Sequence, residues 1–474
     1  MRAYPLLIIG GGLSGLAAGI RFARFGKKVL ILENHSKAGG LNSYYYRNGR
    51  LLETGLHAIT NYAPPEDRHA PLNRLLRQLK IPRKAIKLQE QKFSEILFPG
   101  KSKLVFSNDF KLLESEIAKQ FPLSTRQFAS LVAELDAYNP FTPGPKISSR
   151  RFITSIIQDS LLVEMLLCPI MFYGSSDEDD IDLSQFVILF RSIFQEGLFR
   201  PEGTIKDFLD ILLNQYRNFG GEIEFSSPVT EILSEGNRVS GVRTGNGEKI
   251  GCNYLLTTAG LPETRKLFPA PAQAAKFSDL TRESDSGRLS FFESLYFFDE
   301  ATRHNFPRNR TIIFYNLRDS FLYRRPEKAV DINSGVICFP GNFQGRQIMP
   351  GYVPMRVTHL ANYEIWRDLF NYTDKARYSA EKKLWIKRSR KVLGEIVGNC
   401  DENIVYEDSF TPVTIERYTS RLQGSVYGSP HKVKDGKTGF DNLCIAGTDQ
   451  GYLGIVGSLL SGVTMVNQHI LNKT

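Results

Sequence analysis

The sequence of 474 residues predicts an α/β fold into which a second, α+β part is inserted. A short apolar strand, a glycine-rich turn and a helix stand at the N-terminus, and a similar arrangement recurs near the C-terminus. Between them, residues 221 to 260 contain short strands separated by turn residues. A chain of this length is expected to form two or three domains.

The N-terminal arrangement matches a Rossmann-type βαβ unit. Leu6–Ile9 is an apolar run typical of a buried parallel strand, and Gly10, Gly12 and Gly15 follow it in G-x-G-x-x-G spacing. The first glycine permits a tight turn, the second lets the backbone approach a diphosphate, and the third lets the helix pack closely on the strand. The helix that begins near Leu13 then directs its N-terminal N–H groups at the phosphates.

A carboxylate ends the next strand of this unit. Glu33 lies 18 residues beyond Gly15 and directly after the apolar run 28–32. At this place an acidic side chain accepts hydrogen bonds from ribose hydroxyls and disfavours the 2′-phosphate of NADP. No second G-x-G-x-x-G lies between a strand and a helix, so the sequence predicts one bound dinucleotide and no separate NAD(P) domain.

The C-terminal arrangement has the same order of elements. The run 442–446 reads as a buried strand, and Gly447, Asp449 and Gly454 follow it before a helix from about Val456. A strand that leads into a glycine-rich turn and a helix again directs backbone N–H groups at a ligand. We therefore expect both ends of the chain to contact the same bound molecule.

The motifs of this chain resemble those of the phytoene desaturase, carotenoid isomerase and retinol saturase family of FAD-dependent oxidoreductases. The resemblance extends along nearly the whole chain and rests on both glycine turns, on the pair Gly39-Gly40 and on the segments 53–57, 411–418 and 424–428. Leu41, Leu56 and Ala58 depart from the residues usual in the isomerase and saturase branch. The resemblance implies FAD as the cofactor, in a Rossmann-type (GR2-like) domain with an interleaved α+β substrate domain.

The resemblance also implies specific contacts. Val229 is expected to contact adenine through its backbone, Asp449 the ribityl or diphosphate region, and the N–H groups of Ile455 and Val456 the flavin pyrimidine. His57 is expected beside the isoalloxazine, either as an acid/base or flavin-polarising group or as a structural histidine. The full set of expected cofactor-binding residues is Gly10, Gly12, Leu13, Ser14, Gly15, Glu33, Asn34, Gly39, Gly40, Leu41, Asn42, Val229, Gly447, Asp449, Gly454, Ile455 and Val456.

The expected FAD-binding domain is discontinuous and comprises residues 1–75, 205–265 and 405–474, while 76–204 and 266–404 form the substrate-binding domain. Apolar residues at helical spacing in 161–169 and 186–194 predict buried helices or, alternatively, a mouth that faces lipid. The runs 295–298 and 336–339 predict strands that could floor a cavity.

Composition limits the other possibilities. Five scattered cysteines without a CxxC pair argue against a disulfide framework or a metal site and favour a reducing, cytoplasmic compartment. The net charge of +10 includes a basic, amphipathic stretch around Lys382, Lys383, Lys387, Arg388, Arg390 and Lys391. This stretch predicts a solvated surface helix or a helix attracted to an anionic membrane. No apolar run is long enough to span a bilayer, no motif indicates nucleic acid, and the oligomeric state stays open.

These residues are compatible with four functions to different degrees. The favoured one is a desaturase or saturase that exchanges a hydride between a lipophilic, isoprenoid or carotenoid-like substrate and flavin N5. The alternatives are a redox-neutral polyene cis-trans isomerase, an amine oxidase, and a prenyl-binding escort without FAD. Retention of Glu33 and of both glycine turns argues against the escort.

Overall fold

The computed structural model describes residues 2–55, 58–142, 144–269, 286–345, 351–371, 375–398 and 403–473. Its first sheet has the parallel strands expected from both glycine motifs, and the α/β fold is confirmed. The strand order is β10 (Glu222–Glu224), β2 (Val29–Leu32), β1 (Ala3–Ile9), β13 (Lys249–Thr257), β12 (Arg238–Thr244) and β11 (Val229–Glu235), with β19 (Leu443–Ile445) pairing with β13.

Alternation along β1 divides its side chains between the two faces of this sheet. Leu6 and Ile8 pack under helices, whereas Leu7 and Ile9 face a smaller cluster that includes Leu261 of α9 (Leu261–Lys266). The helices on the larger face are α1 (Leu13–Ala23), α2 (Pro71–Leu79), α8 (Ile205–Asn218) and α14 (Gly454–Met465). The N-terminal and C-terminal helices therefore share one face of one sheet.

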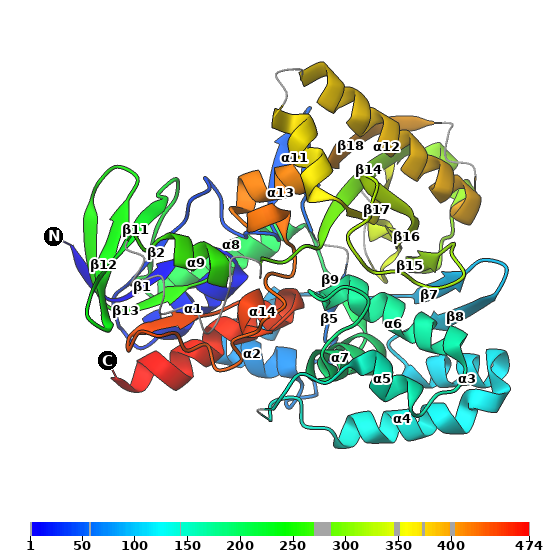
Figure 1. Cartoon of the computed structure of the whole chain (residues 1–474), viewed down its shortest axis with the longest axis horizontal. Coiled ribbons are helices and arrows are strands. Elements are labelled where there is room, and N and C mark those ends of the chain that lie inside the picture. The colour runs from blue at the N-terminus through cyan, green and yellow to red at the C-terminus, as the bar shows by residue number, and fades with distance from the viewer. Residues whose placement is uncertain are drawn as a thin grey trace.

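The second sheet is mostly antiparallel and lies beside the first (Figure 1). Its order is β18 (Ile404–Phe410), β14 (Ser290–Asp299), β17 (Tyr352–Ala361), β16 (Val330–Cys338), β15 (Arg310–Asn316), β7 (Phe93–Phe98) and β8 (Ser102–Phe106). The runs 295–298 and 336–339 fall in or at the end of its strands, as expected. The expected domain boundary at residue 405 falls inside β18, which pairs with β14 of this sheet.

Helices cover both faces of the second sheet. One face packs against α3 (Phe110–Gln120), α4 (Thr125–Ala137), α5 (Ser149–Thr154), α6 (Ser160–Gly174) and α7 (Leu183–Phe190). The other face packs against α11 (Tyr363–Asn371), α12 (Lys375–Val397) and α13 (Pro412–Thr419). Shorter strands pair as β3 (Tyr44–Arg47) with β4 (Arg50–Glu53), and β9 (Leu198–Pro201) with β5 (Ile59–Thr60) and β6 (Leu88–Glu90).

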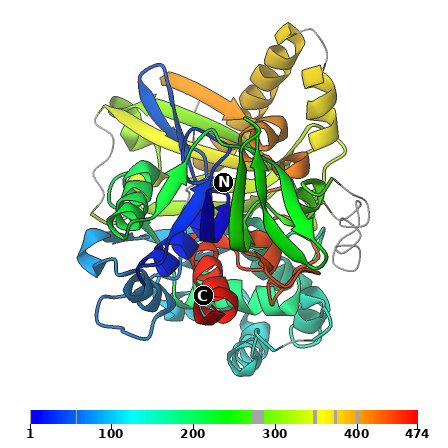
Figure 2. The same cartoon turned by 90° about the vertical axis from the view of Figure 1, so that its left-hand side faces the viewer.

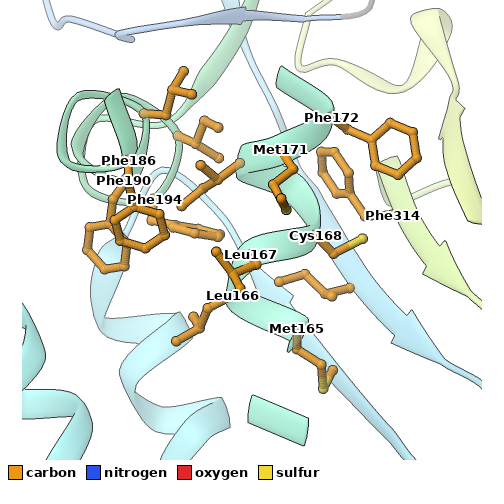
Figure 3. Close-up of a cluster of buried hydrophobic side chains, with 14 of the residues drawn as sticks. Met165, Leu166, Leu167, Cys168, Met171, Phe172, Phe186, Phe190, Phe194 and Phe314 are labelled. Carbon is orange, nitrogen blue, oxygen red and sulfur yellow. The ribbon is translucent and has the colours of Figure 1, made fainter. Parts of the chain in front are cut away.

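The apolar stripes of α6 and α7 are core. Figure 3 shows Leu166, Met171 and Phe190 of these helices among other apolar side chains, and all three are buried. The lipid-facing alternative for these stripes is wrong, because their apolar residues pack against one another and against the sheet. Within the described ranges, no helix combines the length and hydrophobicity needed to cross a bilayer.

The basic stretch forms α12, and its apolar side faces the second sheet. Trp385, Ile386 and Leu393 are buried in the cluster beneath α12, while Lys383 and Lys387 are exposed. The apolar stripe of the helix is therefore used inside the protein. Both chain ends lie at the side of the first sheet, away from α12 (Figures 1 and 2).

Candidate active site

A cavity of about 1070 Å³ runs between the two sheets. Its wall brings together the two glycine motifs, which are more than 400 residues apart in the sequence. Of the expected cofactor-binding residues, the wall includes Gly10, Gly12, Leu13, Ser14, Glu33, Asn34, Gly39, Gly40, Leu41, Asn42, Val229, Gly447, Gly454 and Ile455. Gly15, Asp449 and Val456 do not line it.

The N-terminus of α1 faces this cavity without a side-chain cap. Gly12 occupies the N-cap position, and no side chain accepts a hydrogen bond from the first turn. A Cβ added to Gly12 would meet only the Cα of Gly40, 4.0 Å away. Gly15 lies behind the wall and allows α1 to approach the turn closely, because a Cβ there would lie 2.0 Å from the carbonyl oxygen of Gly10. The first turn of α1 thus presents backbone N–H groups without a side-chain cap, and the third glycine permits close packing.

Glu33 stands at the C-terminal end of β2 on the same wall. One carboxylate oxygen accepts from the Gly11 N–H at 2.6 Å, and the other accepts from the His35 N–H at 2.7 Å. Burial raises the pKa of Glu33, and these two hydrogen bonds oppose that shift. The carboxylate fixes the conformation of the glycine turn, and each of its oxygens keeps a further lone pair as an acceptor.

The N-terminus of α14 faces the cavity from the opposite end of the chain. Leu453 is the N-cap residue and makes no side-chain cap hydrogen bond, and Gly454 and Ile455 line the cavity. The turn before the helix is braced by the Gly447 N–H, which donates to Ser461 Oγ at 2.6 Å. This second uncapped helix start offers further N–H donors to a negatively charged group.

Asp449 was expected to contact the cofactor, but it lies behind the cavity wall. Its carboxylate is fully buried and accepts from the backbone N–H groups of Leu261, at 2.6 Å, and Ser429, at 2.9 Å. Arg421 lies 3.5 Å from this carboxylate and donates to Thr448 Oγ1 at 2.7 Å. Asp449 thus connects the segments that contain Leu261, Ser429 and Arg421. It lies behind the cavity wall, and its carboxylate oxygens accept hydrogen bonds from the protein backbone. Arg421 itself lines the cavity and was missed, since no local motif marks it.

The end of the cavity beyond α14 is apolar. Phe172 of α6 stacks on Phe291 of β14, with ring centroids 6.2 Å apart, and Phe291 meets Tyr427 edge-on at 5.9 Å. Gly174, at the end of α6, packs closely against Leu453, because a Cβ added at Gly174 would lie 2.7 Å from the Leu453 side chain. The apolar end of the cavity therefore lies directly beside the start of α14. Val336 and Ala58 complete the same wall.

A buried carboxylate interrupts this apolar wall. Glu293, Thr358 and Val336 are opposite one another on β14, β17 and β16, and all three line the cavity. Glu293 accepts from Arg356 Nε at 2.8 Å and from the Thr358 hydroxyl. The strand register, rather than any sequence motif, brings this carboxylate to the cavity.

His57 lies outside the described residues, so its position relative to the cavity stays a prediction. Glu53, four residues earlier in the sequence, forms an ion pair with Arg200 at 2.6 Å and accepts from the Ile205 N–H at 2.8 Å. This acidic residue of the 53–57 segment therefore ties β4 to β9 and α8.

The residues of the cavity fit a dinucleotide that carries a diphosphate. The cavity wall contains two helix N-termini without side-chain caps, the glycine turn at Gly12 and the carboxylate of Glu33. These features define a protein with a site for a dinucleotide cofactor, and both ends of the chain line the cavity that contains this site. The model for the family described as flavin containing amine oxidoreductase matches residues 13–468. The chain belongs to this family, and it is an FAD-dependent oxidoreductase.

Individual relatives are distant in sequence but similar in extent. All-trans-retinol 13,14-reductase from Danio rerio is 23% identical, and the match covers 98% of this chain and 86% of the relative. A lycopene-forming phytoene desaturase from Pseudescherichia vulneris is also 23% identical, with 60% of this chain and 61% of the relative covered. An oxidoreductase structure from Methanosarcina mazei has a TM-score of 0.68 at 16% identity and covers 98% of this chain and 100% of that one. The expected family and cofactor are confirmed, and the FAD-free escort is excluded.

Proposed function

We propose that this enzyme saturates or desaturates carbon–carbon bonds of a lipophilic, isoprenoid or carotenoid-like substrate. The observation that carries the proposal is the apolar end of the cavity beside the start of α14, formed by Phe172, Phe291, Val336 and Tyr427. Bound FAD supplies hydride transfer at N5 of its isoalloxazine ring. A wall of this composition suits a hydrocarbon segment, because apolar surface leaves water on contact with it.

The chain's own residues have separate tasks in this proposal. The N–H groups at the start of α1 would hold the diphosphate, Glu33 the ribose, and the N–H groups of Gly454 and Ile455 the negative charge of the reduced cofactor. Phe172 and Phe291 would orient the substrate and exclude water. We propose the remaining expected contacts, including Val229 with adenine, on the same basis.

The names of two relatives support this substrate class. One relative is a reductase of all-trans-retinol and another is a desaturase that forms lycopene. Both names describe a change in the saturation of a polyene, although in opposite directions. Both directions of the reaction therefore require an experimental test.

The test incubates the purified, FAD-loaded enzyme anaerobically with phytoene or, after chemical reduction, with all-trans-retinol. Desaturation bleaches the flavin absorbance as a dehydrogenated product forms, and saturation restores it as a dihydro product forms. A product of unchanged mass without net flavin change would replace the proposal by the isomerase. Bleaching by putrescine, without conversion of either polyene, would replace it by an amine oxidase.

A pair of variants locates the reacting end of the cavity. Val336→Asp places a charge in the apolar wall and is expected to lower turnover more than tenfold while FAD content is retained. Val405→Asp makes the same change at an exposed position of β18 and serves as the control. Equal turnover in the two variants would contradict the assignment of this wall to the substrate.

A further inference from the structure

A second part of the cavity lies between β3, α11, α12 and β18, and we call it the cationic pocket. It is lined by Arg47, Lys382 and Asp408, together with Phe370, Tyr378 and Val413. Its polar groups and its apolar groups belong to the same cavity as the proposed substrate wall. The balance of charge in this pocket indicates what it can bind.

The single carboxylate among these six residues is already neutralised. Arg47 Nη1 donates to both oxygens of Asp408, at 3.0 and 3.2 Å, and Tyr45 donates to Oδ2 at 3.0 Å. The backbone N–H of Ser409 donates to Oδ1 at 2.8 Å. With these donors in place, Asp408 is satisfied, and its negative charge is balanced by Arg47.

Lys382 adds an uncompensated positive charge. Its Nζ donates to the carbonyl oxygen of Ser409 at 2.7 Å, and no other hydrogen bond joins it to the part of the chain that the structure describes. Burial lowers the pKa of Lys382. The negative charge of Asp408 raises this pKa, whereas the positive charge of Arg47 lowers it. An ammonium group has three N–H donors, so two of them remain for a ligand.

The neighbouring carboxylates are turned to other partners. Glu381 accepts from the indole N–H of Trp385 at 2.8 Å, and Glu407 pairs with Arg390 at 2.9 Å. Lys382 also differs from the other lysines of its helix, because residues such as Lys383 and Lys387 are exposed to solvent. The amphipathic helix therefore directs one lysine into the cavity and the others away from it.

We propose that the cationic pocket receives an anionic terminal group, a carboxylate or a phosphate, of the lipophilic substrate. The inference rests on the proposed function, because it places the other end of that substrate along the apolar wall. Lys382 and the remaining donors of Arg47 bind the anion, and Phe370, Tyr378 and Val413 contact the adjoining hydrocarbon. The substrate is then a lipid acid or lipid phosphate rather than a pure hydrocarbon.

The test compares a conjugated tetraenoic acid, parinaric acid, with its methyl ester on the FAD-loaded enzyme. Binding is measured by energy transfer from Trp366 and Trp385, the two tryptophans of the chain, which lie on α11 and α12. The acid is expected to bind about tenfold more tightly than the ester, as one charge-assisted contact would give. Geranylgeranyl phosphate and geranylgeraniol, used as competitors, distinguish a phosphate terminus from a carboxylate.

Variants on one helix separate the pocket from general surface charge. Lys382→Met is expected to weaken the acid about tenfold and to leave the ester unchanged, whereas Lys382→Arg keeps the preference. Lys387→Met removes an exposed lysine of the same helix and should alter neither ligand. FAD content and melting temperature confirm that each variant is folded.

Equal affinities of acid and ester in the unmodified enzyme would overturn the inference, as would an equal loss of both in Lys382→Met. Turnover of neutral polyenes without any acid preference would refute the cationic pocket and leave the proposed function intact. Tight acid binding without any change in a polyene would instead refute the proposed function.

Discussion

The same substitution at two glycines of the N-terminal motif should have opposite consequences. Gly12 has extended backbone angles, φ −70° and ψ 179°, which any residue adopts, and an added Cβ would have ordinary spacing from Gly40. Gly15 is helical, and its added Cβ would lie 2.0 Å from the Gly10 carbonyl oxygen and 3.2 Å from its carbon. Backbone atoms cannot turn aside as a side chain can.

The expected magnitudes follow from these surroundings. Gly12→Ala should leave the free energy of unfolding of the FAD-free protein unchanged or up to about 1 kcal/mol higher, because alanine restricts the unfolded chain. It should weaken FAD binding about 10- to 100-fold, because the methyl group displaces the diphosphate from at least one N–H donor worth about 1.5–3 kcal/mol. Gly15→Ala forces α1 away from β1 and should lower the free energy of unfolding by about 1–3 kcal/mol.

Two measurements on both variants test this reasoning. Urea denaturation of the FAD-free protein gives the free energy of unfolding, and titration with FAD gives the dissociation constant from flavin fluorescence quenching. If Gly12→Ala binds FAD as the unmodified protein does, the diphosphate does not pass this turn. If the FAD-free Gly15→Ala protein is as stable as the unmodified one, the close contact does not hold the helix to the strand.

Two further predictions concern charged groups. Glu33→Ala removes the acceptor of the Gly11 and His35 N–H groups and should weaken FAD binding at least tenfold; wild-type affinity in equilibrium dialysis would contradict the ribose assignment. Desolvation lowers the pKa of Lys432 to about 8, below the value of 10.5 in an unfolded chain. The unfolded chain then binds more protons between these values, so stability should rise by about 1 kcal/mol from pH 7 to pH 9. Lys432→Met should lack this increment, and parallel stability curves for the two proteins between pH 7 and pH 9 would refute it.

The sequence by itself was enough for the fold class, the family and the cofactor. Gly10, Gly12, Gly15 and Glu33 act through local geometry, because a turn, a close approach and a strand end depend on residues that are neighbours in the chain. Their spacing could therefore be interpreted without knowing what packs around them. The helices at 161–169 and 186–194 were also predicted, and burial in the core was the first interpretation of their apolar spacing.

Tertiary structure decided the features that depend on distant strands. The opposition of Glu293, Thr358 and Val336 follows from the register of three strands, and the burial of Asp449 follows from loops that converge on it. In the sequence, nothing distinguishes Lys382 from the other basic residues of its helix, whereas in the structure it lines the cavity. Spacing along the chain specifies local conformation, whereas the contents of a cavity depend on which distant segments meet, and single-sequence patterns carry little information about that meeting.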